Sequence, residues 1–217
     1  MKNSTRNRNM KKDDFSIFYD QTKSYFGDNP SDGLVDALEK YQIKPGKALD
    51  IGAGEGRNSL YLAKSGFSVC AVEPSVLGVE KIKERARESS LDLKVVNADY
   101  LSFESDDIYD FILAGTSIDH MESDSLEKVF TKLKKSLNKN GVVYIVVFTE
   151  DDPGALKKYD EASECADFIK HYFKKDELRE YFNDFEILFY DEYTKKDTTH
   201  GPVHFHAKAK LIAQKIK

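Results

Sequence analysis

Residues 48–63 decide the fold: they read Ala-Leu-Asp-Ile-Gly-Ala-Gly-Glu-Gly-Arg-Asn-Ser-Leu-Tyr-Leu-Ala. The first four residues form a short apolar run typical of a buried strand, and a helical pattern begins directly after Gly52, Gly54 and Gly56. Glycines let a backbone turn sharply and approach a ligand closely, while a helix N-terminus presents unpaired N–H groups. The stretch therefore predicts a strand, a ligand-binding turn and a helix, the first unit of an α/β domain.

The same alternation continues along the chain. Apolar runs predict further strands at residues 68–72, 93–97, 109–114 and 141–148, and helical patterns lie at 57–65, 77–89 and 125–137. Strands that are almost continuously apolar suit a parallel sheet covered on both faces. The runs at 185–191 and 203–213 are separated by only about a dozen residues, too few for a crossover helix, so we expect them to pair antiparallel. The predicted fold is α/β, a doubly wound, mostly parallel seven-stranded sheet with a C-terminal antiparallel hairpin. A further helix is expected at Ser31–Tyr41, with Ser31 as its N-cap.

Composition limits the possible partners. The chain has 217 residues, of which 40% are hydrophobic and 33% charged, which is typical of a globular protein with one main core. A net charge of −5 opposes attraction to nucleic-acid phosphates, so we expect no nucleic-acid partner. The polar residues 1–14 indicate a frayed tail, and no apolar run is long enough to span a bilayer, so we expect a cytoplasmic chain without a membrane partner. The oligomeric state stays open.

Two residues of the glycine loop distinguish between classes of ligand. The dinucleotide pattern G-x-G-x-x-G requires a third glycine where this chain has Arg57. Asp50 stands two residues before Gly52, where a carboxylate would repel a pyrophosphate but attract the α-ammonium group of an amino acid. The loop therefore favours a zwitterionic ligand with a positive sulfonium centre, such as S-adenosylmethionine.

Acidic residues also follow the next two strands. Glu73 ends the second strand, where a carboxylate can accept hydrogen bonds from both hydroxyls of a ribose. Asp99 follows the third strand, where it could accept from an adenine amino group, with Ala98 and Tyr100 against the ring. Each acid alone could be a helix cap or a solvated loop residue. Their joint occurrence after successive strands favours a nucleoside site.

The pattern DxGxGxG at Asp50–Gly56, the acid after the second strand and the aspartate after the third resemble class I S-adenosylmethionine-dependent methyltransferases. More narrowly, GRNSLYLA after the glycines, YFGDNP at residues 25–30 and YFKKDELREYFNDFEILFYDEY near the C-terminus resemble the tellurite-resistance (TehB-like) methyltransferases and their thiopurine-methyltransferase relatives. The resemblance implies a single methyltransferase domain at residues 15–217. It implies cofactor contacts by Asp50, Gly52, Ala53, Gly54, Arg57, Asn58, Glu73, Pro74, Ala98, Asp99, Tyr100 and Gly115. Arg57 and Asn58 match the family's RN pair, which would lie near the cofactor carboxylate or an anionic substrate.

The acceptor side is expected after the fourth strand and at the last one. Asp119 and His120 should face the methyl-transfer site, and His120 could act as a general base. An antiparallel last strand would bring His200, His204 and His206 to the same edge and would make residues 193–202 a lid. These histidines could bind a metal, bind an anion, take a proton or simply lie in a surface lid. We expect a pocket role for His204 or His206 and assign no metal.

The sequence thus predicts an S-adenosylmethionine-dependent methyltransferase that acts on a small molecule, with a thiol or a metalloid oxyanion as candidate acceptor. The Asn/Asp-Pro-Pro-aromatic tetrad common in enzymes that methylate amines is absent, which argues against that substrate class. The family tends to carry arginines in the late loop where this chain has histidines, which argues against tellurite itself. The alternatives are a non-catalytic S-adenosylmethionine-binding sensor or partner protein, and a nucleotide-dependent oxidoreductase.

Overall fold

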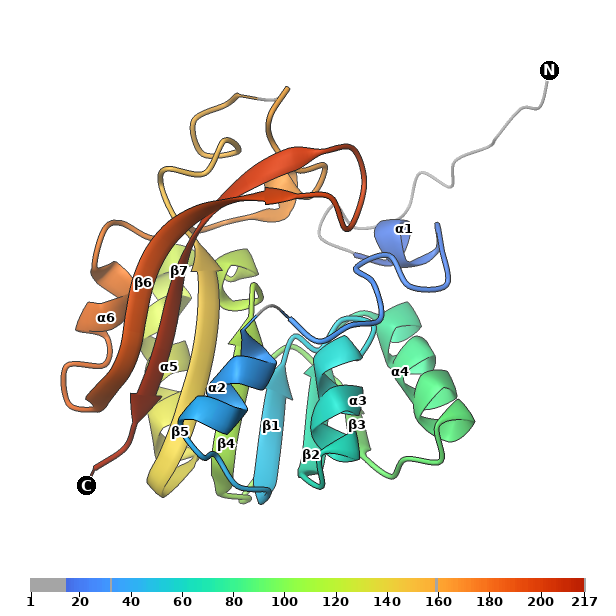
Figure 1. Cartoon of the computed structure of the whole chain (residues 1–217), viewed down its shortest axis with the longest axis vertical. Coiled ribbons are helices and arrows are strands. Elements are labelled where there is room, and N and C mark those ends of the chain that lie inside the picture. The colour runs from blue at the N-terminus through green and yellow to red at the C-terminus, as the bar shows by residue number, and fades with distance from the viewer. Residues whose placement is uncertain (1–14, 32, 159, 217) are drawn as a thin grey trace.

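The computed structural model describes residues 15–31, 33–158 and 160–216. Seven strands form one sheet in the order β3-β2-β1-β4-β5-β7-β6 (Figure 1). Five of them pair in parallel: β1 (Lys47–Ile51), β2 (Ser68–Glu73), β3 (Lys94–Asn97), β4 (Tyr109–Gly115) and β5 (Leu137–Phe148). β7 (His204–Gln214) is antiparallel to both β5 and β6 (Glu186–Asp197). The predicted doubly wound sheet with a C-terminal antiparallel hairpin is confirmed, whereas the tail predicted at residues 1–14 lies outside the described residues.

Two strands are longer than their apolar runs. β5 begins at Leu137 rather than at residue 141, and β6 continues to Asp197 rather than ending at residue 191. The added residues are mostly polar, so hydrophobicity could not reveal them. These residues are in strands because they pair with a neighbouring strand: Leu137 lies opposite Tyr109 of β4, and Asp197 lies opposite His204 of β7.

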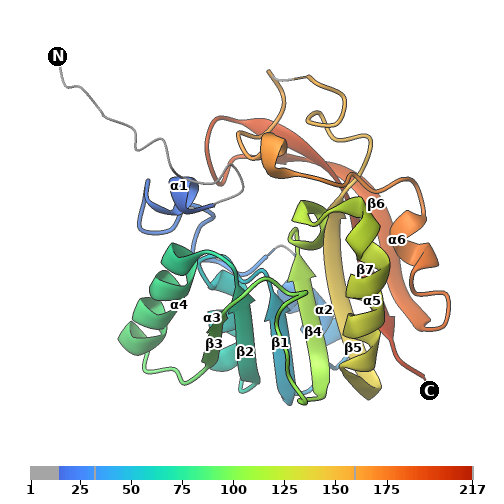
Figure 2. The same cartoon turned by 180° about the vertical axis from the view of Figure 1, so that it is seen from behind.

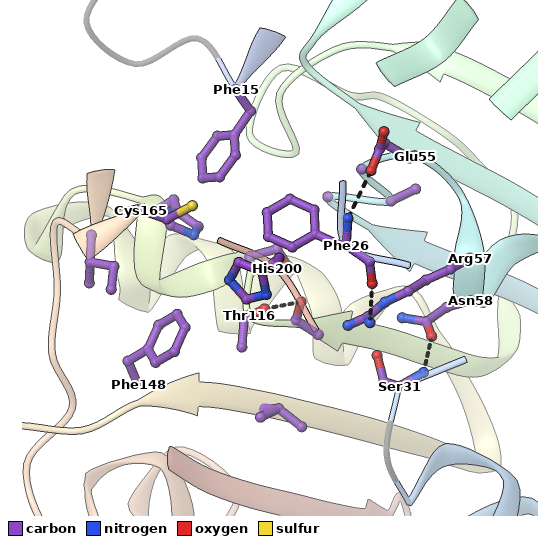
Figure 3. A pocket seen from close by; sticks show the side chains of 18 of the residues that line it. Phe15, Phe26, Ser31, Glu55, Arg57, Asn58, Thr116, Phe148, Cys165 and His200 are labelled. Atoms are coloured by element: carbon purple, nitrogen blue, oxygen red, sulfur yellow. Dashed lines mark hydrogen bonds between the residues drawn. The ribbon is translucent and has the colours of Figure 1, made fainter. Parts of the chain in front are cut away.

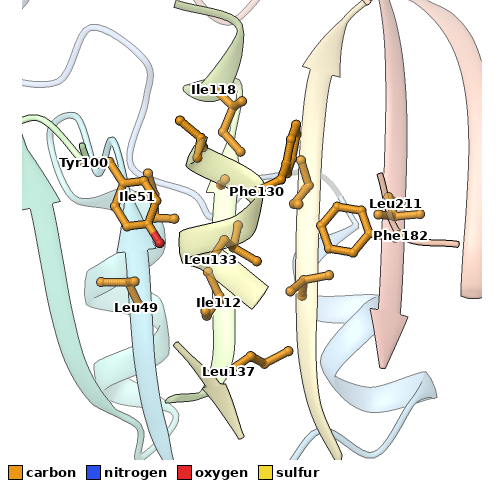
Figure 4. Packing of buried hydrophobic residues seen from close by; sticks show 14 of the residues in the cluster. Leu49, Ile51, Tyr100, Ile112, Ile118, Phe130, Leu133, Leu137, Phe182 and Leu211 are labelled. Atoms are coloured by element: carbon orange, nitrogen blue, oxygen red, sulfur yellow. The ribbon is translucent and has the colours of Figure 1, made fainter. Parts of the chain in front are cut away.

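Helices cover both faces of the sheet (Figures 1 and 2). α3 (Arg57–Lys64), α4 (Val76–Glu88) and α5 (Leu126–Lys135) lie close to the predicted ranges. The apolar face of α5 packs Val129, Phe130 and Leu133 into the main core, where each buried side chain contributes roughly 1.5–3 kcal/mol (Figure 4). The shorter elements are α1 (Ser16–Tyr19), α6 (Glu177–Glu180), and the 3-10 turns η1 (Ile118–His120), η2 (Ser123–Ser125) and η3 (Ala166–Phe168).

The helix before β1 is shorter than predicted. α2 spans Leu34–Lys40, and its N-cap is Gly33 with φ 80° and no side-chain cap, so the prediction that Ser31 caps this helix is wrong. The Ser31 backbone N–H instead donates to Oδ1 of Asn58 at 2.8 Å. Ser31 therefore belongs to the ligand edge of the sheet rather than to α2.

The parallel strands all end at one edge of the sheet. Above that edge lie the tip of the β6–β7 hairpin, the connection from β5 to β6 and the N-terminal segment with α1 (Figures 1 and 2). In an open α/β sheet, ligands bind at this edge. None of the helices in the described residues is both long and apolar enough to cross a bilayer.

Candidate functional site

A cavity of about 680 Å³ lies at the carboxyl edge of the parallel strands. With the exception of Asp50, all predicted cofactor residues line it. Of the predicted acceptor residues, His120 and His206 line it, whereas Asp119 and His204 do not. The predicted lid at residues 193–202 also borders the cavity, because Tyr193 and His200 are part of its wall. Figure 3 shows side chains from the N-terminal segment, the glycine loop and the hairpin around this space.

The glycine loop is held in place by β2. The Gly52 N–H donates to the Val72 carbonyl at 2.9 Å, and the Gly54 N–H donates to Oε2 of Glu73 at 2.8 Å. Gly52 has φ 66°, and a Cβ at this position would collide with the side chain of Ser117. A side chain is excluded there by both conformation and space. The backbone of Gly52, Ala53 and Gly54 therefore forms part of the cavity wall directly.

Glu73 occupies the position predicted for a ribose ligand. Its side chain is buried at the cavity wall, with Oε2 accepting from Gly54 and Oε1 accepting from the Ser75 N–H at 2.9 Å. Each carboxylate oxygen can accept more than one hydrogen bond, so a carboxylate that borders the cavity is chemically suited to ligand hydroxyls. Glu73 thus both fixes the glycine loop and presents a carboxylate edge to the cavity.

Contrary to the prediction, Asp50 does not line the cavity. Its carboxylate is buried, and Oδ2 accepts from the Ser59 hydroxyl of α3 at 2.6 Å. Neighbouring residues of a strand point to opposite faces, and the Asp50 side chain faces α3 while Ile51 and Gly52 border the cavity. Burial raises the pKa of Asp50 to about 6. The structure therefore gives Asp50 a contact between β1 and α3 instead of a direct contact with an ammonium group.

The residues after β3 are only partly arranged as predicted. Ala98 and Asp99 line the cavity, but both oxygens of Asp99 already accept from the following turn, including Oδ2 from the Ser102 hydroxyl at 2.7 Å. The side chain of Tyr100 packs into the core and is 2% exposed, so its ring cannot cover an adenine (Figure 4). Pro74 is exposed beside Glu73 and lines the same part of the cavity.

Arg57 and Asn58 link the cavity to the N-terminal segment. Nη1 of Arg57 donates to the Phe26 carbonyl at 2.9 Å, and the Phe26 N–H donates to Oε2 of Glu55 at 3.2 Å (Figure 3). Asn58 holds the backbone of Ser31, as described above. The predicted RN pair therefore fixes residues 26–31 over the cavity while both side chains also border it.

Asp119 and His120 have opposite environments. Asp119 is fully buried, its Oδ2 accepts from the Phe148 N–H at 3.4 Å, and Oδ1 has no hydrogen-bond partner among the described residues. The prediction that Asp119 faces the transfer site is therefore wrong, because the η1 turn directs it inward, where burial raises its pKa. His120 lines the cavity, and its Nδ1 lies 2.9 Å from the Phe168 carbonyl.

The late histidines meet at the tip of the hairpin. His204 and His206 share a face of β7, as predicted, with their Nε2 atoms 3.0 Å apart. His206 lines the cavity beside the ring of Phe148, but His204 lies behind it. His200 also lines the cavity, and its ring packs against Phe26 (Figure 3). Burial lowers the pKa of His200 to about 4 and also lowers that of His206, so neutral rings are favoured.

Sequence reasoning missed several parts of the cavity wall, among them the N-terminal segment and a lysine of β7. Phe15, Tyr19 and Phe26 come from the N-terminal segment, and only the family-like motif at residues 25–30 pointed to it. Lys208 also lines the cavity, and burial lowers its pKa to about 8. The signal for Lys208 was present, since side chains two residues apart on a strand share a face and Lys208 follows His206 by two.

Comparisons with known proteins agree with this geometry. A family model described as "Tellurite resistance protein TehB" matches residues 10–201. The "Probable S-adenosyl-L-methionine-dependent methyltransferase TehB" of Haemophilus influenzae is 29% identical over 184 residues, which are 84% of this chain and 58% of that protein. "Hemagglutinin 1" of Eikenella corrodens is 28% identical over 155 residues, which are 69% of this chain and 47% of that protein.

The solved structures give the same result. The crystal structure of TehB from Haemophilus influenzae matches with a TM-score of 0.73 and 25% identity, over 93% of this chain and 65% of that one. The chain spans about half to three fifths of the length of the curated relatives named above. Because the family model covers most of its residues, the chain belongs to the family of the tellurite resistance protein TehB.

Proposed function

We propose that this chain is an S-adenosylmethionine-dependent methyltransferase that acts on a small-molecule acceptor, with a thiol or a metalloid oxyanion as the first acceptors to test. The single observation that carries the proposal is one cavity that joins two different kinds of wall. On the β2–β3 side it is bordered by the glycine loop and Glu73, which suit a nucleoside. On the β4–β7 side it is bordered by His120, His206 and Lys208, which suit an acceptor. A named methyltransferase among the relatives supports the same activity.

The wall on the β2–β3 side fits S-adenosylmethionine. Gly54 leaves room that a side chain would fill, since a Cβ there would lie 3.2 Å from the Tyr19 hydroxyl. Glu73 would accept from the ribose hydroxyls, and Ala98 would lie beside the adenine. When bound, S-adenosylmethionine supplies an electrophilic methyl group, so the protein contributes mainly by holding donor and acceptor in line.

The wall on the β4–β7 side offers a base for alcohols and phenols and a positive charge for thiolates and oxyanions. The Phe168 carbonyl can only accept, so Nδ1 of His120 carries the proton and Nε2 of the neutral ring is free to take one. An alcohol or phenol would lose its proton to that nitrogen. A thiolate or oxyanion would need no base, and the ammonium group of Lys208 would attract its charge.

Two competing functions are tested by the same experiment. A sensor would bind S-adenosylmethionine without turnover, and a nucleotide-dependent oxidoreductase would bind NAD, although Arg57 occupies the third glycine position that NAD sites require. Calorimetry with S-adenosylmethionine and NAD should be combined with a screen for S-adenosylhomocysteine release across thiols, metalloid oxyanions, carboxylates and phenols. We expect binding of S-adenosylmethionine alone and release with at least one acceptor. Tight NAD binding would overturn the proposal, and binding without any release would favour the sensor.

A further inference from the structure

The tip of the β6–β7 hairpin gathers four side chains of the types that bind metal ions. Asp197 ends β6, His200 lies in the turn, and His204 and His206 begin β7; one donor atom from each lies within 4.8 Å of all the others. Pairing of Asp197 opposite His204 explains why residues of different strands meet here. His204 and His206 are each 3% exposed. The group is therefore a built, largely buried cluster and not a chance grouping on the surface.

The two buried histidines have fixed tautomers. Nδ1 of His204 lies 2.7 Å from the Pro202 carbonyl, which can only accept, so this nitrogen carries a proton. Nδ1 of His206 lies 3.2 Å from Oδ2 of Asp152, and the Asp152 carboxylate also accepts from the backbone N–H groups of Ala207 and Gly154. Both Nδ1 atoms are therefore donors. In the neutral rings both Nε2 atoms then carry lone pairs.

These two lone pairs face each other at 3.0 Å, which is unfavourable unless positive charge lies between or beside them. A metal ion removes the repulsion by accepting both lone pairs. In a tetrahedral site with metal–nitrogen bonds of about 2.0–2.1 Å, two ligand nitrogens lie roughly 3.3 Å apart, close to the observed separation.

We propose that Asp197, His200, His204 and His206 bind a divalent transition-metal ion, with Zn²⁺ as the expected ion. Three imidazole nitrogens and one carboxylate oxygen form a four-ligand set that Zn²⁺ accepts. Asp152 acts as a positioning residue, since metal-bound histidines usually donate their second N–H to a carboxylate or carbonyl group.

Charges around the cluster both favour and oppose a cation. The Asp197 carboxylate accepts hydrogen bonds from the backbone N–H and the hydroxyl of Thr199, and such contacts favour its charged form. Arg57 interacts electrostatically with Asp197, and Lys208 with Asp197 and His200, so both positive side chains are near enough to repel a cation. The carboxylates of Asp197 and Asp152 offset that repulsion. Because Asp197, His200 and His206 also line the cavity, the ion would form part of its wall and would tie the hairpin turn to β7.

Metal binding can be measured without any assay of methyl transfer, so its outcome is independent of the proposed activity. The full chain, purified without a histidine tag and freed of metal with a chelator, is titrated with Zn²⁺ by calorimetry, and native mass spectrometry counts the bound ions. We expect one ion per chain. Co²⁺ in place of Zn²⁺ should give the visible absorption of a four-coordinate site.

Matched variants locate the site. Asp152→Asn should weaken Zn²⁺ binding by about tenfold to a hundredfold, as loss of an orienting partner does, and His204→Gln or His206→Gln should weaken it more. His171→Gln is the control, because that ring contacts Ser123 and Glu177 outside the cluster and its loss should leave binding unchanged. If the histidine variants do not fold, Asp197→Asn replaces them, because this carboxylate is partly exposed. No bound ion in the wild-type chain, or wild-type affinity in folded cluster variants, overturns the proposal.

Discussion

Replacing Glu73 with glutamine tests the cofactor side of the cavity with the least change of shape. The carboxylate accepts from the Gly54 N–H at 2.8 Å and from the Ser75 N–H at 2.9 Å while it borders the cavity. Glutamine keeps one of the two acceptor oxygens but turns the other into a donor and removes the charge. Alanine would be a poorer test, because it would leave both backbone N–H groups without partners and loosen the loop itself.

The expected magnitude follows from the lost charge. A hydrogen bond to a charged group contributes about 1.5–3 kcal/mol, and each 1.4 kcal/mol changes a dissociation constant tenfold. The dissociation constant of S-adenosylhomocysteine should therefore rise by about tenfold to a hundredfold in Glu73→Gln. Calorimetry measures this directly, and thermal unfolding checks that the variant is folded.

Asp110→Asn provides the matched control for this test. The Asp110 carboxylate also accepts from a backbone N–H, that of Lys47 at 2.9 Å, but it does not border the cavity. Its replacement should leave affinity for S-adenosylhomocysteine unchanged. A folded Glu73→Gln variant with wild-type affinity would refute the reasoning that Glu73 binds the ribose.

The remaining predictions concern stability and chemistry. Because burial raises the pKa of Asp50 to about 6, the folded chain holds this proton more tightly than the unfolded chain, and stability is lost as pH rises from about 4 to 6. Asp50→Asn keeps an acceptor for the Ser59 hydroxyl but carries no charge. Its free energy of unfolding, measured with urea, should exceed that of the wild type by up to about 3 kcal/mol at pH 7 and by less at pH 4.5. An equal difference at both pH values would contradict this prediction. Gly52→Ala should lower the free energy of unfolding by more than about 1 kcal/mol, because residue 52 has a positive φ and a Cβ there would collide with Ser117. A lower thermal unfolding midpoint would show this loss. His120→Gln should slow methylation of a phenol by about 10²-fold or more, because the base would be lost. The rate of thiol methylation and the affinity for S-adenosylhomocysteine should stay near those of the wild type. An equal loss of rate with thiols would exclude a role of His120 as base.

The fold was largely predictable from the sequence, because its parallel strands are almost entirely apolar. The predicted strands were too short where the strand residues are polar, as at residues 138–140 of β5 and 194–197 of β6. Those segments are strands because they pair with a neighbour, and pairing between distant segments leaves no local pattern. The same limit explains Ser31, which is a plausible cap by type but bonds to Asn58, 27 positions further along the chain.

For the candidate site, the sequence predicted the neighbourhood of most residues but not the direction of each side chain. Glu73 and His120 border the cavity as expected, whereas the side chains of Asp50 and Asp119 turn into the protein, and Tyr100 lines the cavity although its ring packs in the core. Asp50 and Asp119 each lie next to a residue that does border the cavity. At the end of a strand, a shift of one position reverses the face to which a side chain points. Motif spacing fixes which backbone reaches the ligand edge, but packing against α3 or the core decides which side chain points into the cavity.

Transfer of a labelled methyl group tests the central claim most directly. The chain is incubated with S-adenosylmethionine that carries a ¹³C-labelled methyl group, together with thiol, metalloid oxyanion and phenol acceptors, and the label is followed by NMR. We expect the label to move from the sulfonium to one of these acceptors with release of an equal amount of S-adenosylhomocysteine. A chain that binds the labelled compound but leaves every label on the sulfonium would contradict it.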